Sequence, residues 1–128
     1  MKRLIIVFTM TILLFTSCLG PSNRILVSYY PAQCWATAWE ELWFEENDKT
    51  MTDWYALSEN QRLDIIETYV EDELNVGVFE IHHYPLPPDR GVCAACGCPR
   101  GEHYELLIEE RNLDLMQFNG FSLVEEEE

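Results

Sequence analysis

Basic residues are scarce in this sequence. Its 128 residues include 8 lysines and arginines against 23 aspartates and glutamates, so the formal net charge is −15. Nucleic acids and anionic lipid headgroups repel a chain this acidic, and no nucleic-acid partner is therefore expected. The acidic residues are spread along the chain apart from residues 125–128, which are predicted to form a solvated acidic tail.

The motifs of common enzymes are also missing. The sequence contains no nucleophile elbow, no HExxH and no glycine-rich phosphate-binding loop. It lacks the alternating Asp/Asn pattern with a central glycine that calcium loops require. The carboxylates are too numerous to single out a catalytic pair. We therefore expect a protein that is not an enzyme, with no catalytic residue and no cofactor.

Long apolar runs are absent except at the N-terminus. Leu4–Phe15 is an apolar run of 12 residues that follows Lys2 and Arg3. A membrane-spanning helix needs about 20 apolar residues, so this run is too short to span a bilayer. A short positive region followed by such a run is typical of a secretory signal peptide.

The residues after this run, FTSC at 15–18, resemble the lipobox of bacterial lipoproteins. They depart from the common pattern at Phe15, where leucine is usual. In that family the signal peptide is removed and the cysteine, here Cys18, carries the lipid. The resemblance implies a signal peptide over 1–17 and a protein anchored to a membrane of the bacterial cell envelope.

The rest of the chain has the length of one domain. Residues 18–32 include Gly20 and Pro21 and are predicted to form a lipidated tether. We expect a single folded domain over 33–124.

Two helices are predicted in the first half of this domain. Residues 33–46 place Trp35, Trp39, Leu42 and Trp43 at helical spacing. The tryptophans could form a carbohydrate- or lipid-binding face, but the stripe has the width of a buried face, which favours packing in the core. Ser58 and Gln61 form a capping box that begins a second helix after a polar connection at 47–53. The apolar face of this second helix comprises Leu63, Ile66, Val70 and Leu74.

The second half predicts strands. Residues 76–84 are rich in β-branched and aromatic residues, and residues 103–109 place Tyr104, Leu106 and Ile108 in alternation. A loop with prolines, glycines and cysteines lies between them. A short helix over 112–118 and a last short strand over 121–124 follow. The inward side of this helix is expected to carry Leu113, Met116 and Phe118. The predicted fold class is α+β, with two N-terminal helices, an antiparallel strand pair joined by the Cys-rich loop, and a short C-terminal helix.

The cysteine loop has the pattern CxxCxCP-x-G from Cys93 to Gly101. Together with the strand, the short helix and the Gly-Phe pair that follow it, this loop resembles small domains of bacterial envelope lipoproteins. The resemblance covers only this C-terminal part of the chain and implies no activity.

Four cysteines remain if Cys18 is acylated, namely Cys34, Cys93, Cys96 and Cys98. An even number of cysteines in a small exported domain favours disulfides. A Cys96–Cys98 bridge would close a strained ring over one residue. Two pairings remain open: Cys34–Cys96 with Cys93–Cys98, or Cys34–Cys98 with Cys93–Cys96.

Two other chemistries compete with disulfides. If the strands pair, His83 and His103 bracket the loop and could join Cys93, Cys96 and Cys98 as ligands of zinc or copper(I). Thiol–disulfide exchange is the third possibility because Cys93 and Cys96 have redox spacing. The leading hypothesis is a disulfide-stabilised, lipid-anchored module that binds an envelope protein or another ligand.

Overall fold

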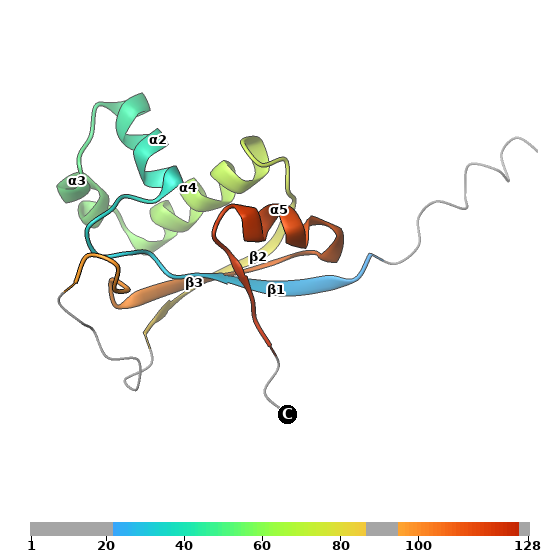
Figure 1. Cartoon of the computed structure of the whole chain (residues 1–128). Helices are drawn as coiled ribbons and strands as arrows, with labels where there is room; N and C mark the ends of the chain where they lie inside the picture. The colour runs from blue at the N-terminus through green and yellow to red at the C-terminus, as the bar shows by residue number, and fades with distance from the viewer. Residues whose placement is uncertain (1–21, 87–94, 126–128) are drawn as a thin grey trace, which may run out of the picture.

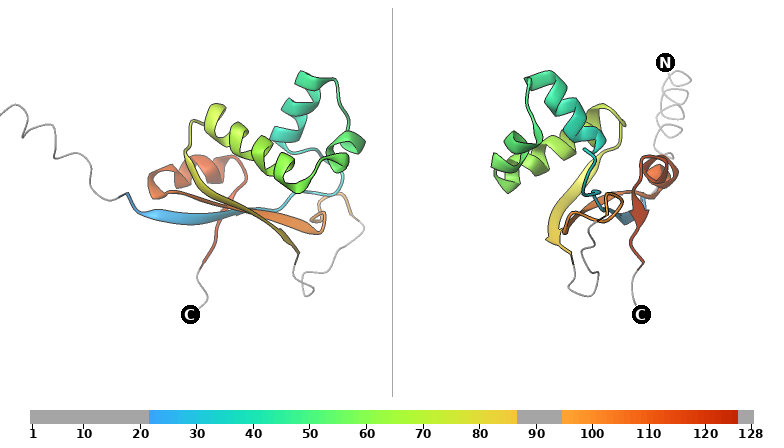
Figure 2. Two further views of the ribbon diagram at one scale, coloured as in Figure 1. Left: turned by 180° about the vertical axis from the view of Figure 1, so that it is seen from behind. Right: turned by 60° about the vertical axis from the view of Figure 1, so that its left-hand side comes forward.

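The computed structural model describes residues 22–86 and 95–125, which form a four-stranded antiparallel sheet with helices over one face (Figures 1 and 2). The predicted signal peptide, Cys18, Cys93 and residues 126–128 lie outside the described residues. This mixture of helices and sheet is compatible with the predicted α+β class. The elements in chain order are β1 (Arg24–Tyr29), α2 (Ala38–Asn47), α3 (Met51–Ala56), α4 (Glu59–Asp72), β2 (Val78–Pro85), β3 (Glu102–Glu109), the 3₁₀ turn η1 (Glu110–Asn112), α5 (Leu113–Phe118) and β4 (Ser122–Leu123).

Strand β1 corrects the predicted tether. Residues 18–32 were expected to link the lipid to the domain, but 24–29 form a central strand of the sheet, whose order is β2-β3-β1-β4. β1 lies antiparallel to β3, with Arg24 opposite Glu109 and Tyr29 opposite Tyr104. Val27 of this strand is fully buried. The folded domain therefore includes residues before 33. The sequence alone does not reveal this strand, because its pairing partner β3 lies far along the chain.

The antiparallel pairing of the two predicted strands is confirmed as β2 and β3. His83 lies opposite Tyr104, and Tyr84 lies opposite His103. A register shift between Val78 and Glu80 marks a bulge at the start of β2.

The helix that follows Ser58 is confirmed as α4, and the capping box forms as predicted. The Ser58 backbone N–H donates to Gln61 Oε1 at 3.0 Å, and the Gln61 N–H donates to Ser58 Oγ at 3.4 Å. Ile66 and Val70 are fully buried. The polar connection expected at 47–53 is shorter, because α3 begins at Met51.

The tryptophan stripe is only partly in the core. Trp39 is 2% exposed, and Trp43 is half-buried against the core, as predicted. Trp35 is 63% exposed, so the prediction of a core position is wrong for this residue. The reason is local: Thr37 forms the N-cap of α2 in a capping box with Glu40, so Trp35 precedes the helix and does not share its buried face.

In the C-terminal helix, too, one side chain that was predicted to be buried is exposed. Met116 is fully buried and Leu113 packs against the core, but Phe118 at the last position of α5 is 89% exposed and was wrongly expected to face inward. Gly120 follows with φ +89°, and a Cβ there would lie 3.1 Å from Tyr29 Cε2. Glycine is therefore required at this turn into β4.

Candidate functional site

A disulfide joins the segment before α2 to the end of the cysteine loop. Cys34 and Cys96 are 62 positions apart in sequence, and their Cα atoms are 4.7 Å apart. Cys98 also takes part in a disulfide. The Cys34–Cys96 bridge is the one expected in the first of the two pairings that the sequence left open, and it excludes a Cys93–Cys96 redox disulfide in this structure.

Backbone hydrogen bonds reinforce the bridge. The Gln33 N–H donates to the Cys98 carbonyl at 2.8 Å, and the Arg100 N–H donates to the Pro31 carbonyl at 2.9 Å. Ala32 and Pro99 form an isolated antiparallel bridge between these two bonds. We call residues 31–40 and 95–100 together the clamp.

A buried ion pair completes the clamp. The side chains of Arg100 and Glu40 are only 4% and 1% exposed, and the guanidinium donates to both carboxylate oxygens of Glu40. Arg100 Nε also donates to the Ala32 carbonyl at 2.7 Å, and Glu40 Oε2 accepts the Thr37 N–H at 2.7 Å. Each guanidinium nitrogen and each carboxylate oxygen of the pair therefore has a hydrogen-bond partner, as a buried ion pair requires. Burial alone would lower the pKa of Arg100, but the hydrogen bonds and charge of Glu40 raise it above its usual value.

The proposed metal ligands that lie within the described residues, His83, His103, Cys96 and Cys98, are not brought together as a metal site. Directly paired residues share a face of the sheet and consecutive residues alternate, so His83 and His103 point to opposite faces. His83 contacts Glu102 at 3.0 Å, whereas the His103 ring stacks on Tyr30 with a centroid distance of 4.9 Å. The disulfide-bonded Cys96 and Cys98 offer no thiolate. No cluster of three potential metal-binding side chains occurs within 22–86 and 95–125.

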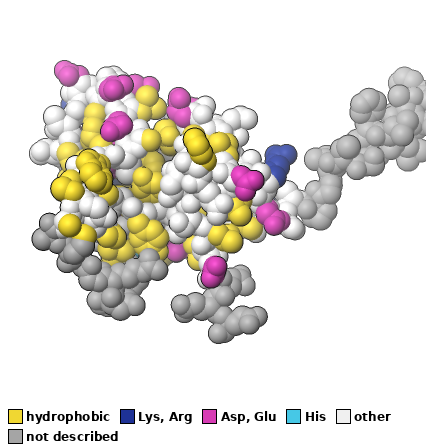
Figure 3. Space-filling model, in the orientation of Figure 1, with side chains coloured by type: hydrophobic (Ala, Val, Ile, Leu, Met, Phe, Trp, Pro, Cys, Tyr) yellow, Lys and Arg dark blue, Asp and Glu magenta, His cyan; other side chains and the backbone are white. Residues whose placement is uncertain are grey.

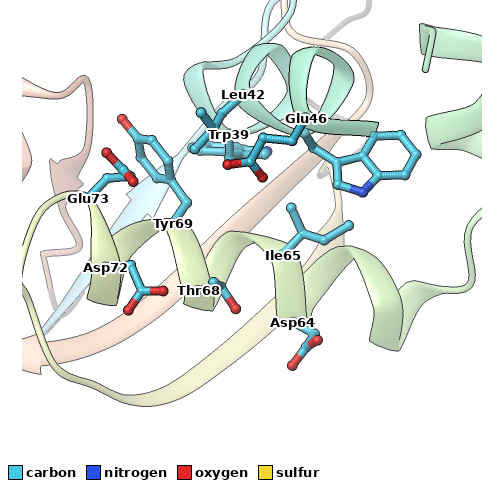
Figure 4. A pocket seen from close by; sticks show the side chains of 10 residues that line it. Trp39, Leu42, Glu46, Asp64, Ile65, Thr68, Tyr69, Asp72 and Glu73 are labelled. Atoms are coloured by element: carbon cyan, nitrogen blue, oxygen red, sulfur yellow. The ribbon is translucent and has the colours of Figure 1, made fainter. Parts of the chain in front are cut away.

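A second feature, which sequence reasoning missed, is a groove of about 210 Å³ between α2 and α4 (Figure 4). Its apolar walls and its rim come from side chains at helical spacing on both helices. The signal in the sequence was the acidic row beside the apolar face of α4. The apolar side chains are Trp39, Leu42, Trp43 and Ile65, the carboxylates are Glu46, Asp64, Asp72 and Glu73, and Thr68 and Tyr69 complete the lining. We call this hollow the acidic groove.

The charged side chains that line the acidic groove are all negative. No lysine, arginine or histidine lines it. Burial, and then the charge of Glu73, raises the pKa of Tyr69 above its ordinary value. On the face shown in Figure 3, acidic side chains are spread widely and few basic ones are visible. The arrangement favours a cationic ligand with an apolar part.

Comparisons with known proteins yield no match to a protein-family model, a curated protein or a solved structure. Within the described ranges, no helix combines the length and the apolar character needed to cross a bilayer.

Proposed function

We propose that this protein is a binding module of the bacterial cell envelope, anchored by lipid at Cys18 and stabilised by disulfides. The observation that carries the proposal is the Cys34–Cys96 bridge between distant segments. Disulfides of this kind persist in oxidising compartments outside the cytosol. This favours export, which the resemblance of residues 15–18 to a lipobox independently implies.

The second disulfide is assigned by elimination. Cys34 and Cys96 bond to each other, and Cys98 is also bonded. With Cys18 acylated, the remaining partner for Cys98 is Cys93. The proposed pairing is therefore Cys34–Cys96 with Cys93–Cys98.

The short tether would hold the domain near the bilayer. β1 begins at Arg24, so only residues 18–23 separate the proposed lipid from the sheet. Six extended residues reach at most about 20 Å. The acidic domain would stand off from anionic headgroups by charge repulsion while remaining close enough to engage membrane-associated partners.

Binding by the helical layer fits the described architecture better than thiol chemistry. A redox-active CxxC pair would bond Cys93 to Cys96, but Cys96 is bonded to Cys34. The acidic groove is a hollow with apolar walls and polar groups at its rim, which is the usual composition of a binding site.

Mass spectrometry of the full-length chain expressed in a bacterium, combined with membrane fractionation, tests the proposal. The wild-type protein is expected in the membrane fraction, beginning at Cys18, with acyl chains on that residue and no free thiol. Cys18→Ala is expected to remain uncleaved or unacylated. Wild-type protein found in the soluble fraction with residues 1–17 attached would overturn the proposal.

A further inference from the structure

We propose that the acidic groove binds an extended protein segment with the pattern basic-x-apolar-x-basic. This inference rests on the proposed binding function and names the chemistry of its partner. Two neighbouring helices and the charges along them support it.

The groove has apolar surface that the core does not use. Leu42 lines the groove and lies outside the set of side chains that pack against the buried core. Trp43 and Ile65 pack against the core on one side and remain half-buried where they line the groove. A volume of about 210 Å³ is smaller than the roughly 300–1,000 Å³ typical of drug-sized ligand pockets. It suits one or two side chains better than a cofactor.

The carboxylates that line the groove need a cation from another molecule. Among the described residues, none of the rim carboxylates forms an ion pair, while the arginines have other partners. Arg62, Arg100 and Arg111 pair with glutamates, and Arg24 lies over the Phe79 ring at 3.9 Å. Lys49 does not line the groove. A second copy of this acidic chain is a poor source of cations.

The spacing of the rim defines the partner. Asp64, Thr68 and Asp72 line the groove at intervals of four residues along α4. In Figure 4 they project from the side of α4 that faces away from α2. The rise of a helix places Asp64 and Asp72 about 12 Å apart along the axis. In an extended segment, two side chains separated by four residues are about 13 Å apart and point to the same side.

The residue midway between two such basic side chains also points to that side. It would therefore lie next to Thr68, beside the apolar wall that Ile65 and Tyr69 form where they point toward α2. The aliphatic stems of lysine or arginine can pack on such a wall, and the heads can contact aromatic faces or carboxylates. An extended basic-x-apolar-x-basic segment thus matches the groove in charge, polarity and spacing.

Tryptophan fluorescence titration of the full-length purified chain with synthetic peptides tests this inference. Trp35→Phe in every variant removes the exposed tryptophan outside the groove from the signal. The probe is acetyl-Gly-Arg-Ser-Leu-Ser-Arg-Gly-amide. The control peptide, acetyl-Gly-Arg-Leu-Ser-Ser-Arg-Gly-amide, has the same composition and charge but turns leucine away from the groove. We expect the probe to bind about fivefold more tightly than the control.

Two variants with the same change in net charge separate site binding from general attraction. Glu46→Gln/Asp64→Asn/Asp72→Asn should weaken probe binding about tenfold or more. Glu45→Gln/Asp48→Asn/Asp114→Asn changes residues outside the groove lining and should weaken it less than about twofold at physiological salt.

Several outcomes would overturn the inference. They are no binding of the probe, equal affinity for the two peptides, or equal losses in the two variants. Arg90 is an arginine outside the described residues. Tighter probe binding after Arg90→Ala would mean that this arginine of the chain itself occupies the groove, which also overturns the inference. Spermine displacing the probe at equal concentration would show that the groove recognises only charge and would reject the peptide pattern. Fractionation and intact mass test the proposed envelope function independently of these titrations.

Discussion

The clamp and the acidic groove use the same helix, α2, in opposite ways. Glu40 near its start is 1% exposed and pairs with Arg100, and its carboxylate also accepts the Thr37 N–H. Glu46 near its end lines the groove, without a cationic partner in the described part of the chain. A buried carboxylate with every partner in place contributes to the architecture. A carboxylate at the rim of an apolar hollow is available to a ligand.

The largest expected effect comes from Trp39, which belongs to the core and also lines the groove. Trp39→Ala should cost about 3–5 kcal/mol of unfolding free energy, because its ring packs edge-on against Tyr29 at a centroid distance of 4.7 Å. Trp35→Ala is the matched control and should change stability by less than about 0.5 kcal/mol. Urea unfolding monitored by circular dichroism measures both. Similar costs for the two variants would mean that the assignment of core and surface tryptophans is wrong.

Removing the Cys34–Cys96 bridge should have the next largest effect and should separate the two regions. The double variant Cys34→Ser/Cys96→Ser releases a loop of 62 residues, which the chain-entropy account values at up to about 4 kcal/mol. The melting temperature should fall by several degrees or more. Affinity of the folded protein for the probe peptide should stay within about twofold, because neither cysteine lines the groove. An unchanged melting temperature would show that the bridge does not hold the clamp.

Sequence reasoning found features whose partners are close along the chain. Ser58 and Gln61 revealed the start of α4 because a capping box needs only three residues of separation. The sequence predicts a tether over 24–29 because the main partner of this stretch, β3, begins far along the chain at Glu102. The Arg100–Glu40 pair was missed for the same reason, since a buried ion pair between positions 60 apart has no local pattern. The cysteines narrowed the bridges to two pairings, and only the fold brings Cys34 to Cys96.

The acidic groove and the two histidines also depend on contacts between segments that are far apart in the sequence. The sequence shows the acidic row of α4, but the groove exists only where that helix packs beside α2. His83 and His103 bracket the cysteine loop in sequence, yet the register of β2 and β3 places them on opposite faces of the sheet. A shift of one residue in that register would place both histidines on the same face of the sheet.

A smaller effect is expected at the start of α4, which forms one wall of the groove. Ser58→Ala removes the side-chain acceptor of the Gln61 N–H and should cost about 1 kcal/mol of unfolding free energy. Ser58→Asn retains a capping side chain and should restore most of the loss. Urea midpoints compare the three proteins. If Ser58→Ala weakens probe binding as strongly as the triple groove variant does, the groove depends on the helix end and not on its own carboxylates.

The most direct measurement of the contrast between the two regions compares Glu40→Gln with Glu46→Gln by both urea unfolding and peptide titration. Glutamine preserves the shape of each side chain and removes its charge. At position 40 its one oxygen can still accept the Thr37 N–H of the capping box, while its amide group replaces an acceptor of the Arg100 guanidinium. Glu40→Gln should lose about 3 kcal/mol of stability, because it leaves the Arg100 charge buried without its counterion. Glu46→Gln should stay within about 0.5 kcal/mol of the wild type and should weaken probe binding by at least about twofold. A Glu46→Gln protein that loses stability but binds normally, beside a Glu40→Gln protein that is as stable as the wild type, would contradict the account.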